Sequence, residues 1–276
     1  FKLFNFECYS PNNQKIILDT FHQISTKNCQ YLLSYKYLSL SFPSEKIIQI
    51  SNSPPLKYMP AFSMRYFSLK TLEYVLQKPE IINNWKFDNY MNILFAVAEG
   101  MSYLHDHLIC HGNLCPSNIV IDEADQFYLS DFGLLPIKKL YNKEENLFNE
   151  IYKDPNMENN EPTFKNDIYS FGILMCDIFR IYFQSFGQIR HQKLSHFITK
   201  STTNNFNLFP SFFSSLIPSC LHKSMDKRPT FRQILDLFKT ANKSTIDINL
   251  QNLYNDFIQS NYIVKLAEKK DSYSLN

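Results

Sequence analysis

The spacing of apolar residues predicts a long amphipathic helix near the middle of the chain. Six apolar residues there recur at intervals of three, four and seven: Tyr90, Ile93, Leu94, Val97, Met101 and Leu104. Two later segments, Ile168 to Tyr182 and Phe231 to Phe238, are also expected to be helices. Thr230 precedes the second one and is a candidate N-cap.

The first 70 residues have a shorter period and favour strands. We expect strands in Phe1 to Cys8 and in Pro60 to Phe67, and two strands within Tyr31 to Phe42. Apolar residues at helical spacing predict a short helix from Ile16 to Ser25.

A hairpin and a long loop are predicted further along the chain. The short apolar runs Ile119 to Ile121 and Phe127 to Leu129 flank a polar turn, which is typical of a hairpin. Residues 134–165 are polar and interrupted by three prolines, so they are expected to form a loop. The layout indicates an α+β protein with a small strand-rich lobe followed by a larger helical lobe.

Composition excludes several classes of protein. With 28 Lys+Arg, 26 Asp+Glu and a net charge of +2, the chain has no polyelectrolyte field for nucleic acid. Its five glycines are too far apart for a G-x-G phosphate loop. No apolar run reaches the roughly 18 residues that span a bilayer. Six scattered cysteines without a C-x-x-C pair indicate a reduced, cytoplasmic protein, and the start at Phe1 suggests a piece of a longer chain.

Four short motifs follow one another along the chain. Their order and spacing together indicate a protein family more specifically than any single motif does. Cys110-His111-Gly112-Asn113-Leu114-Cys115-Pro116-Ser117-Asn118 is followed by Asp131-Phe132-Gly133, then by Asp167-Ile168-Tyr169-Ser170-Phe171-Gly172, and last by Arg228-Pro229-Thr230. Together they resemble the eukaryotic protein kinase domain, and most closely its tyrosine-kinase-like branch. The resemblance covers residues 1–240, with a small lobe in 1–67 and a large lobe in 68–240. Residues 241–276 are expected to form a helical extension.

The resemblance implies a nucleotide site. Asp131 and Asn118 match the residues that hold Mg²⁺, and both offer the hard oxygen that this ion prefers. Met64 matches the gatekeeper, and Tyr66 lies in the hinge segment that would bind adenine. Lys2 matches the phosphate-contacting lysine, although an ordinary surface lysine explains it equally well. The helix that would supply the glutamate partner of this lysine has Asp19 and Thr20 near that point.

The catalytic loop departs from the family at three positions. Asn113 replaces the carboxylate that accepts the proton of the substrate hydroxyl, and an amide is no base at neutral pH. Cys115 stands where Ser/Thr kinases carry a lysine that neutralises the transferring phosphate. Gly112 replaces the arginine that engages a phosphorylated activation loop. The H-G-N sequence resembles that of pseudokinases.

The activation loop departs as well. Between Asp131 and Pro162 its hydroxylated residues are Tyr141 and Tyr152, so phospho-Ser/Thr cannot order it. The family's A-P-E motif appears as Asp154-Pro155-Asn156. We therefore expect the pair between its glutamate and Arg228 to be reduced to a charge–amide hydrogen bond from Asn156.

Other residues are assigned structural roles. By resemblance, Asp167 bonds to the catalytic-loop backbone, and His111, Phe132 and Ile24 join the apolar stack between the lobes. His105 is expected to pack rather than to bind metal with His107. Lys138 and Lys139 are expected on a solvated face.

Three hypotheses remain open on the sequence. The first is a pseudokinase that binds protein partners, with ATP and Mg²⁺ as its implied cofactors. The second is a weakly active kinase, because phosphoryl transfer depends largely on positioning. The third is an interaction module of kinase fold that binds no nucleotide. Neither a nucleic acid nor a membrane is expected as a partner.

Overall fold

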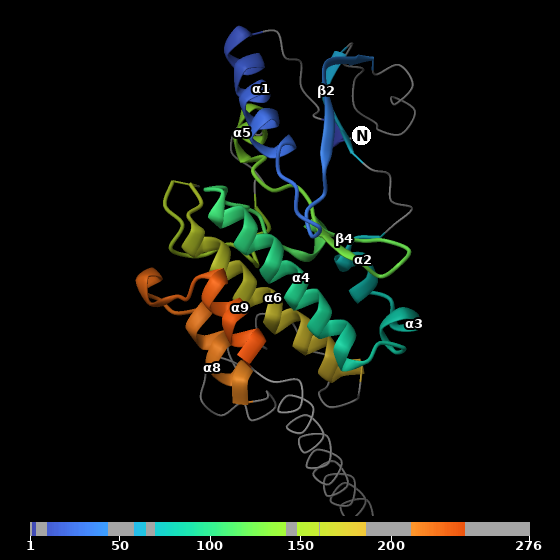
Figure 1. Cartoon of the computed structure of the whole chain (residues 1–276), viewed down its shortest axis with the longest axis vertical. Helices are drawn as coiled ribbons and strands as arrows, with labels where there is room; N and C mark the ends of the chain where they lie inside the picture. The colour runs from blue at the N-terminus through green and yellow to red at the C-terminus, as the bar shows by residue number, and fades with distance from the viewer. Residues whose placement is uncertain are drawn as a thin grey trace, which may run out of the picture.

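The computed structural model describes residues 2–3, 10–43, 58–64, 70–141, 148–159, 161–185 and 211–240. A small part containing a sheet and one long helix sits beside a larger part built mainly of helices (Figure 1). The two-lobed α+β architecture predicted from the sequence is therefore present. The extension expected in 241–276 lies outside the described residues, and no described helix is long and apolar enough to cross a membrane.

The small lobe is an antiparallel sheet with a helix beside it. Its strand order is β1-β3-β2. The strands are β1 Lys2–Leu3, β2 Tyr35–Pro43 and β3 Tyr58–Met64. The prediction of two strands between Tyr31 and Phe42 was wrong, because this segment contains the single strand β2. Two register shifts against β3 interrupt the alternation of inward and outward side chains along β2. In the sequence, such an interruption looks like the end of one strand and the start of another.

Helix α1, Pro11–Ser25, begins earlier than its apolar pattern. Ser10 caps it by accepting a hydrogen bond from Asn13 N at 3.4 Å, and proline is well suited to the first turn. Its buried residues are Ile17, Thr20 and Ile24, which share one face. The added first turn is polar, so hydrophobic periodicity could not reveal it.

The large lobe is built on helix α4, Phe87–Asp106, which packs between α6 and α9. The three helices expected here from apolar periodicity are all present, and four others in the described part of the lobe were not predicted. The remaining helices are α2 Leu72–Leu76, α3 Pro79–Ile82, α5 Leu135–Tyr141, α6 Phe164–Ser185, α8 Ser211–Cys220 and α9 Phe231–Thr240. Thr230 caps α9 as predicted, because its Oγ1 accepts from Gln233 N at 3.2 Å while Gln233 Oε1 accepts from Thr230 N at 2.8 Å.

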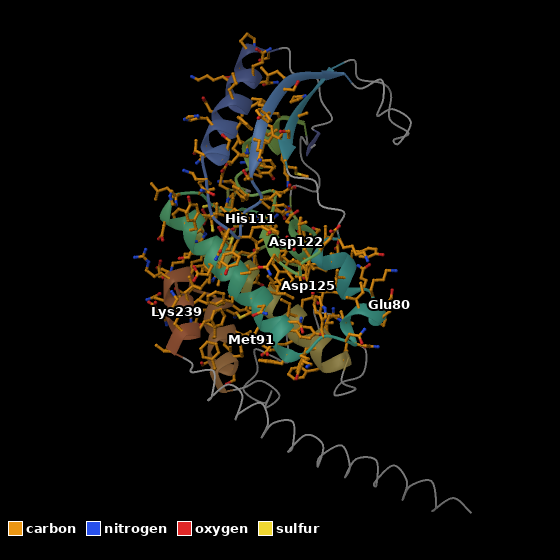
Figure 2. The ribbon with its side chains drawn as sticks, turned by 45° about the vertical axis from the view of Figure 1, so that its right-hand side comes forward. Glu80, Met91, His111, Asp122, Asp125 and Lys239 are labelled. Atoms are coloured by element: carbon orange, nitrogen blue, oxygen red, sulfur yellow. The ribbon has the colours of Figure 1, made fainter. Side chains whose placement is uncertain are left out.

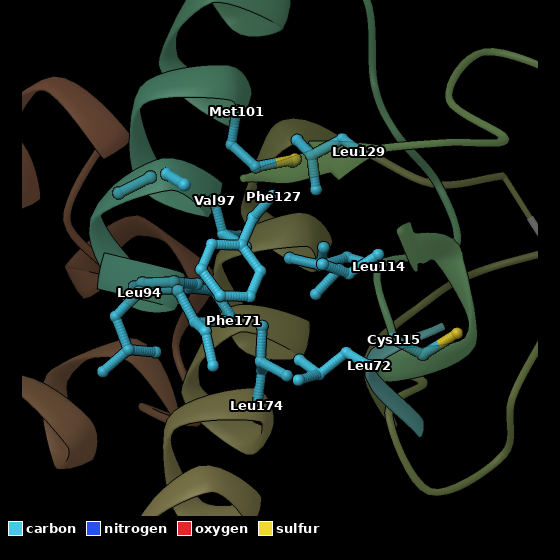
Figure 3. Packing of buried hydrophobic residues seen from close by; sticks show 14 of the residues in the cluster. Leu72, Leu94, Val97, Met101, Leu114, Cys115, Phe127, Leu129, Phe171 and Leu174 are labelled. Carbon is cyan, nitrogen blue, oxygen red and sulfur yellow. The ribbon is translucent and has the colours of Figure 1, made fainter. Parts of the chain in front are cut away.

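The predicted hairpin is confirmed with its expected bounds, β4 Ile119–Ile121 and β5 Phe127–Leu129. Leu129 packs into the core beside Met101 of α4 (Figure 3). A Cβ on Gly100 would lie 2.8 Å from Leu129 Cδ1, so a larger residue there would force the Leu129 side chain to shift. Leu129 also exchanges backbone hydrogen bonds of 2.8 Å with Tyr31 and Leu33, which tie the hairpin to the chain entering the small lobe.

Helix α5 corrects the expectation of a loop over 134–165. It begins two residues after Gly133 and packs against α1, with Ile137 fully buried. Pro136 argued against a helix in the sequence, but it lies in the first turn, where the missing N–H has no intrahelical partner to lose. A helix of seven residues is also too short to show a clear period.

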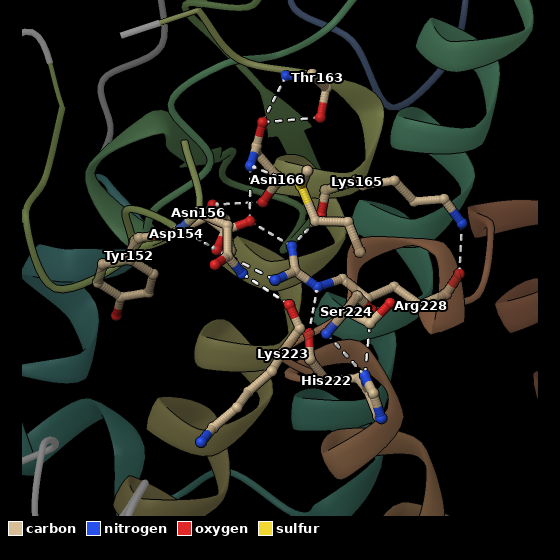
Figure 4. Close-up of polar contacts among 12 residues, drawn as sticks. Tyr152, Asp154, Asn156, Thr163, Lys165, Asn166, His222, Lys223, Ser224 and Arg228 are labelled. Atoms are coloured by element: carbon tan, nitrogen blue, oxygen red, sulfur yellow. Dashed lines mark hydrogen bonds and ion pairs between the residues drawn. The ribbon is translucent and has the colours of Figure 1, made fainter. Parts of the chain in front are cut away.

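Arg228 forms a buried ion pair with Asp154, and both side chains are fully shielded from solvent (Figure 4). The guanidinium also donates to the carbonyl oxygens of His222 and Lys165, at 2.9 and 2.8 Å. Asn166 Nδ2 donates to Asp154 Oδ2 at 2.6 Å. The carboxylate therefore accepts bonds from two side chains, which offsets the cost of its burial.

This pair overturns the expectation for Asn156. Its amide nitrogen donates to Lys223 O at 2.9 Å, and the hydrogen bonds of the Arg228 guanidinium go to other residues. The carboxylate that compensates Arg228 is instead that of Asp154, two residues before Asn156 in the same motif. The charge pair is thus retained, with its acidic partner moved from the third position of the motif to the first.

We expect Asp154→Asn to lower the free energy of unfolding by about 3–5 kcal/mol, because it leaves a buried guanidinium uncompensated. Asn156→Ala is the matched control and should cost under about 1.5 kcal/mol, since it removes one exposed hydrogen bond. Urea denaturation followed by circular dichroism measures both. Equal losses for the two variants would show that Asp154 does not balance Arg228.

Candidate functional site

The site lies between the lobes, in two loops that follow helix α4 and strand β5. The first loop contains His111, which Figure 2 places at the level where the two lobes meet. The second loop begins at Asp131. A hydrogen bond from Ser130 N to Asn118 O, 2.9 Å long, joins the two loops near the hairpin. The sequence motifs are thus brought together as the resemblance implied.

Asp167 in the first turn of α6 holds the first loop in shape. Its carboxylate accepts hydrogen bonds from His111 N at 2.8 Å and Gly112 N at 2.9 Å. His105 Nε2 lies 2.9 Å from the same carboxylate. Gly112 has a φ of +76°, and a Cβ there would lie 3.0 Å from Pro162 Cγ. The bent backbone that Asp167 binds therefore suits glycine.

Asn113 is tied to the activation segment. Its Oδ1 accepts a hydrogen bond from Asn149 N at 3.2 Å, and its own N–H donates to His111 Nδ1 at 3.3 Å. The side chain at the catalytic-base position thus binds the protein's own backbone. A carboxamide also has no lone pair that takes up a proton at neutral pH.

The Asn118 side chain is held by the backbone of the first loop. Its amide nitrogen donates to Asn113 O at 2.7 Å, and the side chain is nearly buried. Since the nitrogen is committed to this carbonyl, the oxygen is the atom left for a cation. This hydrogen bond also fixes the distance between the two asparagines along the loop.

Asp131 is paired with a lysine that was expected elsewhere. Its backbone has a φ of +62°, and its N–H donates to the Tyr35 hydroxyl at 3.0 Å. The ammonium of Lys138, on α5, lies 3.5 Å from Asp131 Oδ2. The Lys138 side chain is only 14% exposed, so the solvated face predicted for it was wrong. Lys139 forms an ion pair with Glu161 at the surface.

Cys115 supplies no charge to the site. Burial raises the pKa of its thiol, although hydrogen bonds from Ser117 oppose the effect. The thiol is therefore neutral at physiological pH and lies 3.1 Å from the Ser117 hydroxyl. The positive charge that the family places here is absent from this position.

His111 and Tyr35 remain neutral beside Asp131. Burial lowers the pKa of His111, partly offset by the nearby charge of Asp167. Because His111 Nδ1 accepts from Asn113 N, the ring proton sits on Nε2, which has no hydrogen-bond partner in the described part of the chain. Burial and the Asp131 charge raise the pKa of Tyr35 far above its ordinary value. Neither His111 nor Tyr35 therefore adds a charge beside the pair of Asp131 and Lys138.

The implied Mg²⁺ does not fit this arrangement as it stands. Asp131 and Asn118 offer hard oxygens, but the ammonium of Lys138 already balances the Asp131 carboxylate. A divalent ion about 2.1 Å from that oxygen would stand close to the ammonium and be repelled by it. Binding of Mg²⁺ therefore requires Lys138 to move.

The residues expected around the nucleotide are only partly described. Met64 ends β3 opposite Tyr35 and packs against the core. Lys2 pairs with Phe62 in the sheet, but its side chain lies outside the described residues, as does Tyr66. Thr20 is buried on α1 and Asp19 is exposed, so neither puts a carboxylate into the core. Ile24, His111 and Phe132 are each buried, as the apolar stack implied.

Two residues gave signals that sequence reasoning misjudged. Lys138 appeared as part of a charge run, and Asp154 was considered only as a replaced alanine. His105 was expected to pack, and it does lie against Phe164 and Phe231, but it also contacts Asp167. The shielded residues Leu134, Ile137 and Lys138 are three and four positions apart, as on one helix face, but the helix is too short for this spacing to stand out in the sequence.

Comparison with known proteins agrees with this geometry. The family model of the protein tyrosine and serine/threonine kinases matches residues 10–238. The chain is 27% identical over 199 residues to human receptor-interacting serine/threonine-protein kinase 1, covering 63% of this chain and 30% of that protein. It is 31% identical over 151 residues to mitogen-activated protein kinase kinase kinase 13-A of Xenopus laevis, covering 51% of this chain and 15% of that protein.

Fibroblast growth factor receptor 1 of Dugesia japonica is 25% identical over 193 residues, which cover 67% of this chain and 22% of that receptor. The chain thus spans less than a third of the length of each of these relatives. Because the family model extends over both lobes and the intervening site, the chain belongs to the protein tyrosine and serine/threonine kinase family.

Proposed function

We propose that this domain is a pseudokinase, a kinase fold that acts through protein contacts and not through phosphate transfer. The observation that carries the proposal is Asn113. It places a carboxamide where a kinase needs a base, and the amide oxygen accepts a hydrogen bond from Asn149 N. A substrate hydroxyl at this point would meet an occupied, non-basic atom.

The lost charges support the same conclusion. Phosphoryl transfer depends on positive groups that neutralise the developing charge of the phosphate. Cys115 is a buried, neutral thiol at one such position, and the nearby Lys138 is paired with Asp131. General-base assistance contributes about 10²–10⁴-fold to rates. Without this assistance and without a neutralising cation, we expect little of the kinase rate of phosphoryl transfer to remain.

A second candidate, a weakly active kinase, is favoured by Asn118. Its hydrogen bond to Asn113 O keeps the metal-ligand geometry of the loop, and positioning alone can support some transfer. An interaction module without nucleotide is the third candidate. Thermal unfolding with and without Mg-ATP distinguishes it, since a ligand at 100 times its Kd adds about 2.7 kcal/mol of stability.

Tyr152, one of the two tyrosines of the activation segment, is hydrogen-bonded to α6. Tyr152 donates from its hydroxyl to Asp177 Oδ2 at 2.6 Å and is 5% exposed. Burial, together with the charge of Asp177, raises its pKa. Ser170 Oγ donates to Tyr152 O at 2.8 Å and fixes the backbone as well. We infer that Tyr152 locks the segment onto α6 and is not a phosphorylation site of the folded domain.

We expect the purified domain to transfer phosphate from radiolabelled Mg-ATP to a generic protein substrate at no more than the background rate. Asn113→Asp should not restore an ordinary kinase rate, because Cys115 still supplies no positive charge. Asp131→Ala is the control for contaminating kinases. Transfer by the wild-type domain that disappears in Asp131→Ala would instead establish the weakly active kinase.

An added tyrosine kinase should phosphorylate exposed Tyr37 and leave Tyr152 unmodified in the folded domain, as measured by mass spectrometry of proteolytic peptides. Tyr37 is 74% exposed and serves as the internal control. After unfolding in urea and transfer to assay buffer as peptides, both tyrosines should be modified. Equal labelling of the two in the native domain would contradict the lock.

A further inference from the structure

Helix α5 carries a positive charge into the site. The helix lies against α1, and its residue Ile137 is fully buried. The next residue, Lys138, is 14% exposed, and its ammonium lies 3.5 Å from Asp131 Oδ2. The position of the ammonium is therefore set by the packing of a helix and not by a freely moving side chain.

Asp131 is equally constrained. Its backbone N–H donates to the buried Tyr35 hydroxyl, and its φ of +62° turns the chain immediately before α5. Its side chain is 11% exposed. A buried carboxylate requires a positive partner, and in this arrangement Lys138 provides one.

We propose that Lys138 is a tethered cation that takes the place of a divalent metal ion at Asp131. A divalent ion then binds to Asp131 only when α5 moves away. A free ion must compete with a group that is attached seven positions along the same chain and so acts at high effective concentration. Ion binding at Asp131 and phosphate transfer are measured separately. Lys138 can therefore fail to exclude the ion in a pseudokinase, and it can exclude the ion in a domain that proves to be a weak kinase.

The adjacent lysine offers a matched control. Lys139 has the same charge and lies in the same helix, but it pairs with Glu161, whose side chain is 70% exposed. Removing the charge of Lys139 therefore changes the net charge of the domain by the same amount without affecting Asp131. Any difference between the two lysine variants reports on the site itself.

The test is a titration of the purified domain with Mn²⁺ alone, followed by electron paramagnetic resonance of the free ion. Lys138→Met should bind Mn²⁺ about tenfold or more tightly than the wild type, because it removes the ammonium that lies 3.5 Å from Asp131 Oδ2 and repels a divalent ion. Lys139→Met should match the wild type. Asp131→Asn introduced into Lys138→Met should abolish the gained binding, which assigns it to this carboxylate.

Two results would overturn the proposal. One is a folded Lys138→Met variant whose Mn²⁺ affinity equals that of the wild type. The other is tight Mn²⁺ binding by the wild type that Asp131→Asn removes, and this measurement needs no lysine variant. It therefore decides the question even if circular dichroism shows that Lys138→Met does not fold. The phosphate-transfer assay is separate and is not affected by either result.

Discussion

The carboxylate of Asp167 is the constraint on which the site depends. It is buried in the first turn of α6, and it binds two consecutive backbone N–H groups of the H-G-N loop as well as the His105 ring. A buried carboxylate is stable only when such donors satisfy it, so the loop and the helix fix each other. Gly112 must adopt a left-handed conformation to bring its N–H to this acceptor. The positions of the remaining loop residues depend on this bend at Gly112.

The domain preserves charge compensation while changing which residues provide it. Arg228 keeps a buried carboxylate partner, but the partner is Asp154 and not the third residue of the motif. Asp131 keeps a positive neighbour, which comes from α5. Both cases follow from the same rule, because a buried charge needs a partner of opposite sign, whichever position in the sequence supplies it.

Under the proposed function, groups that position the backbone are kept and groups that perform chemistry are replaced. Asn118 still bonds to the loop carbonyl, and the apolar residues between the lobes remain buried. The base and a neutralising ammonium are replaced by a carboxamide and a neutral thiol. Packing residues are needed for stability, whereas a proton-accepting residue is needed only for turnover. A domain that acts through its shape can therefore lose the proton-accepting residue and keep the packing residues.

The sequence by itself determined the two lobes, the long helices, the hairpin and the identity of the site loops, since apolar periodicity and local motifs carry that information along the chain. It also determined that Asn113 cannot act as a base, which is a property of the side chain alone. Only the tertiary structure decided that Lys138 faces Asp131, that Asp154 compensates Arg228 and that Tyr152 is locked to Asp177. These pairs join residues from different elements. Their distances depend on how the helices pack, which no local pattern encodes.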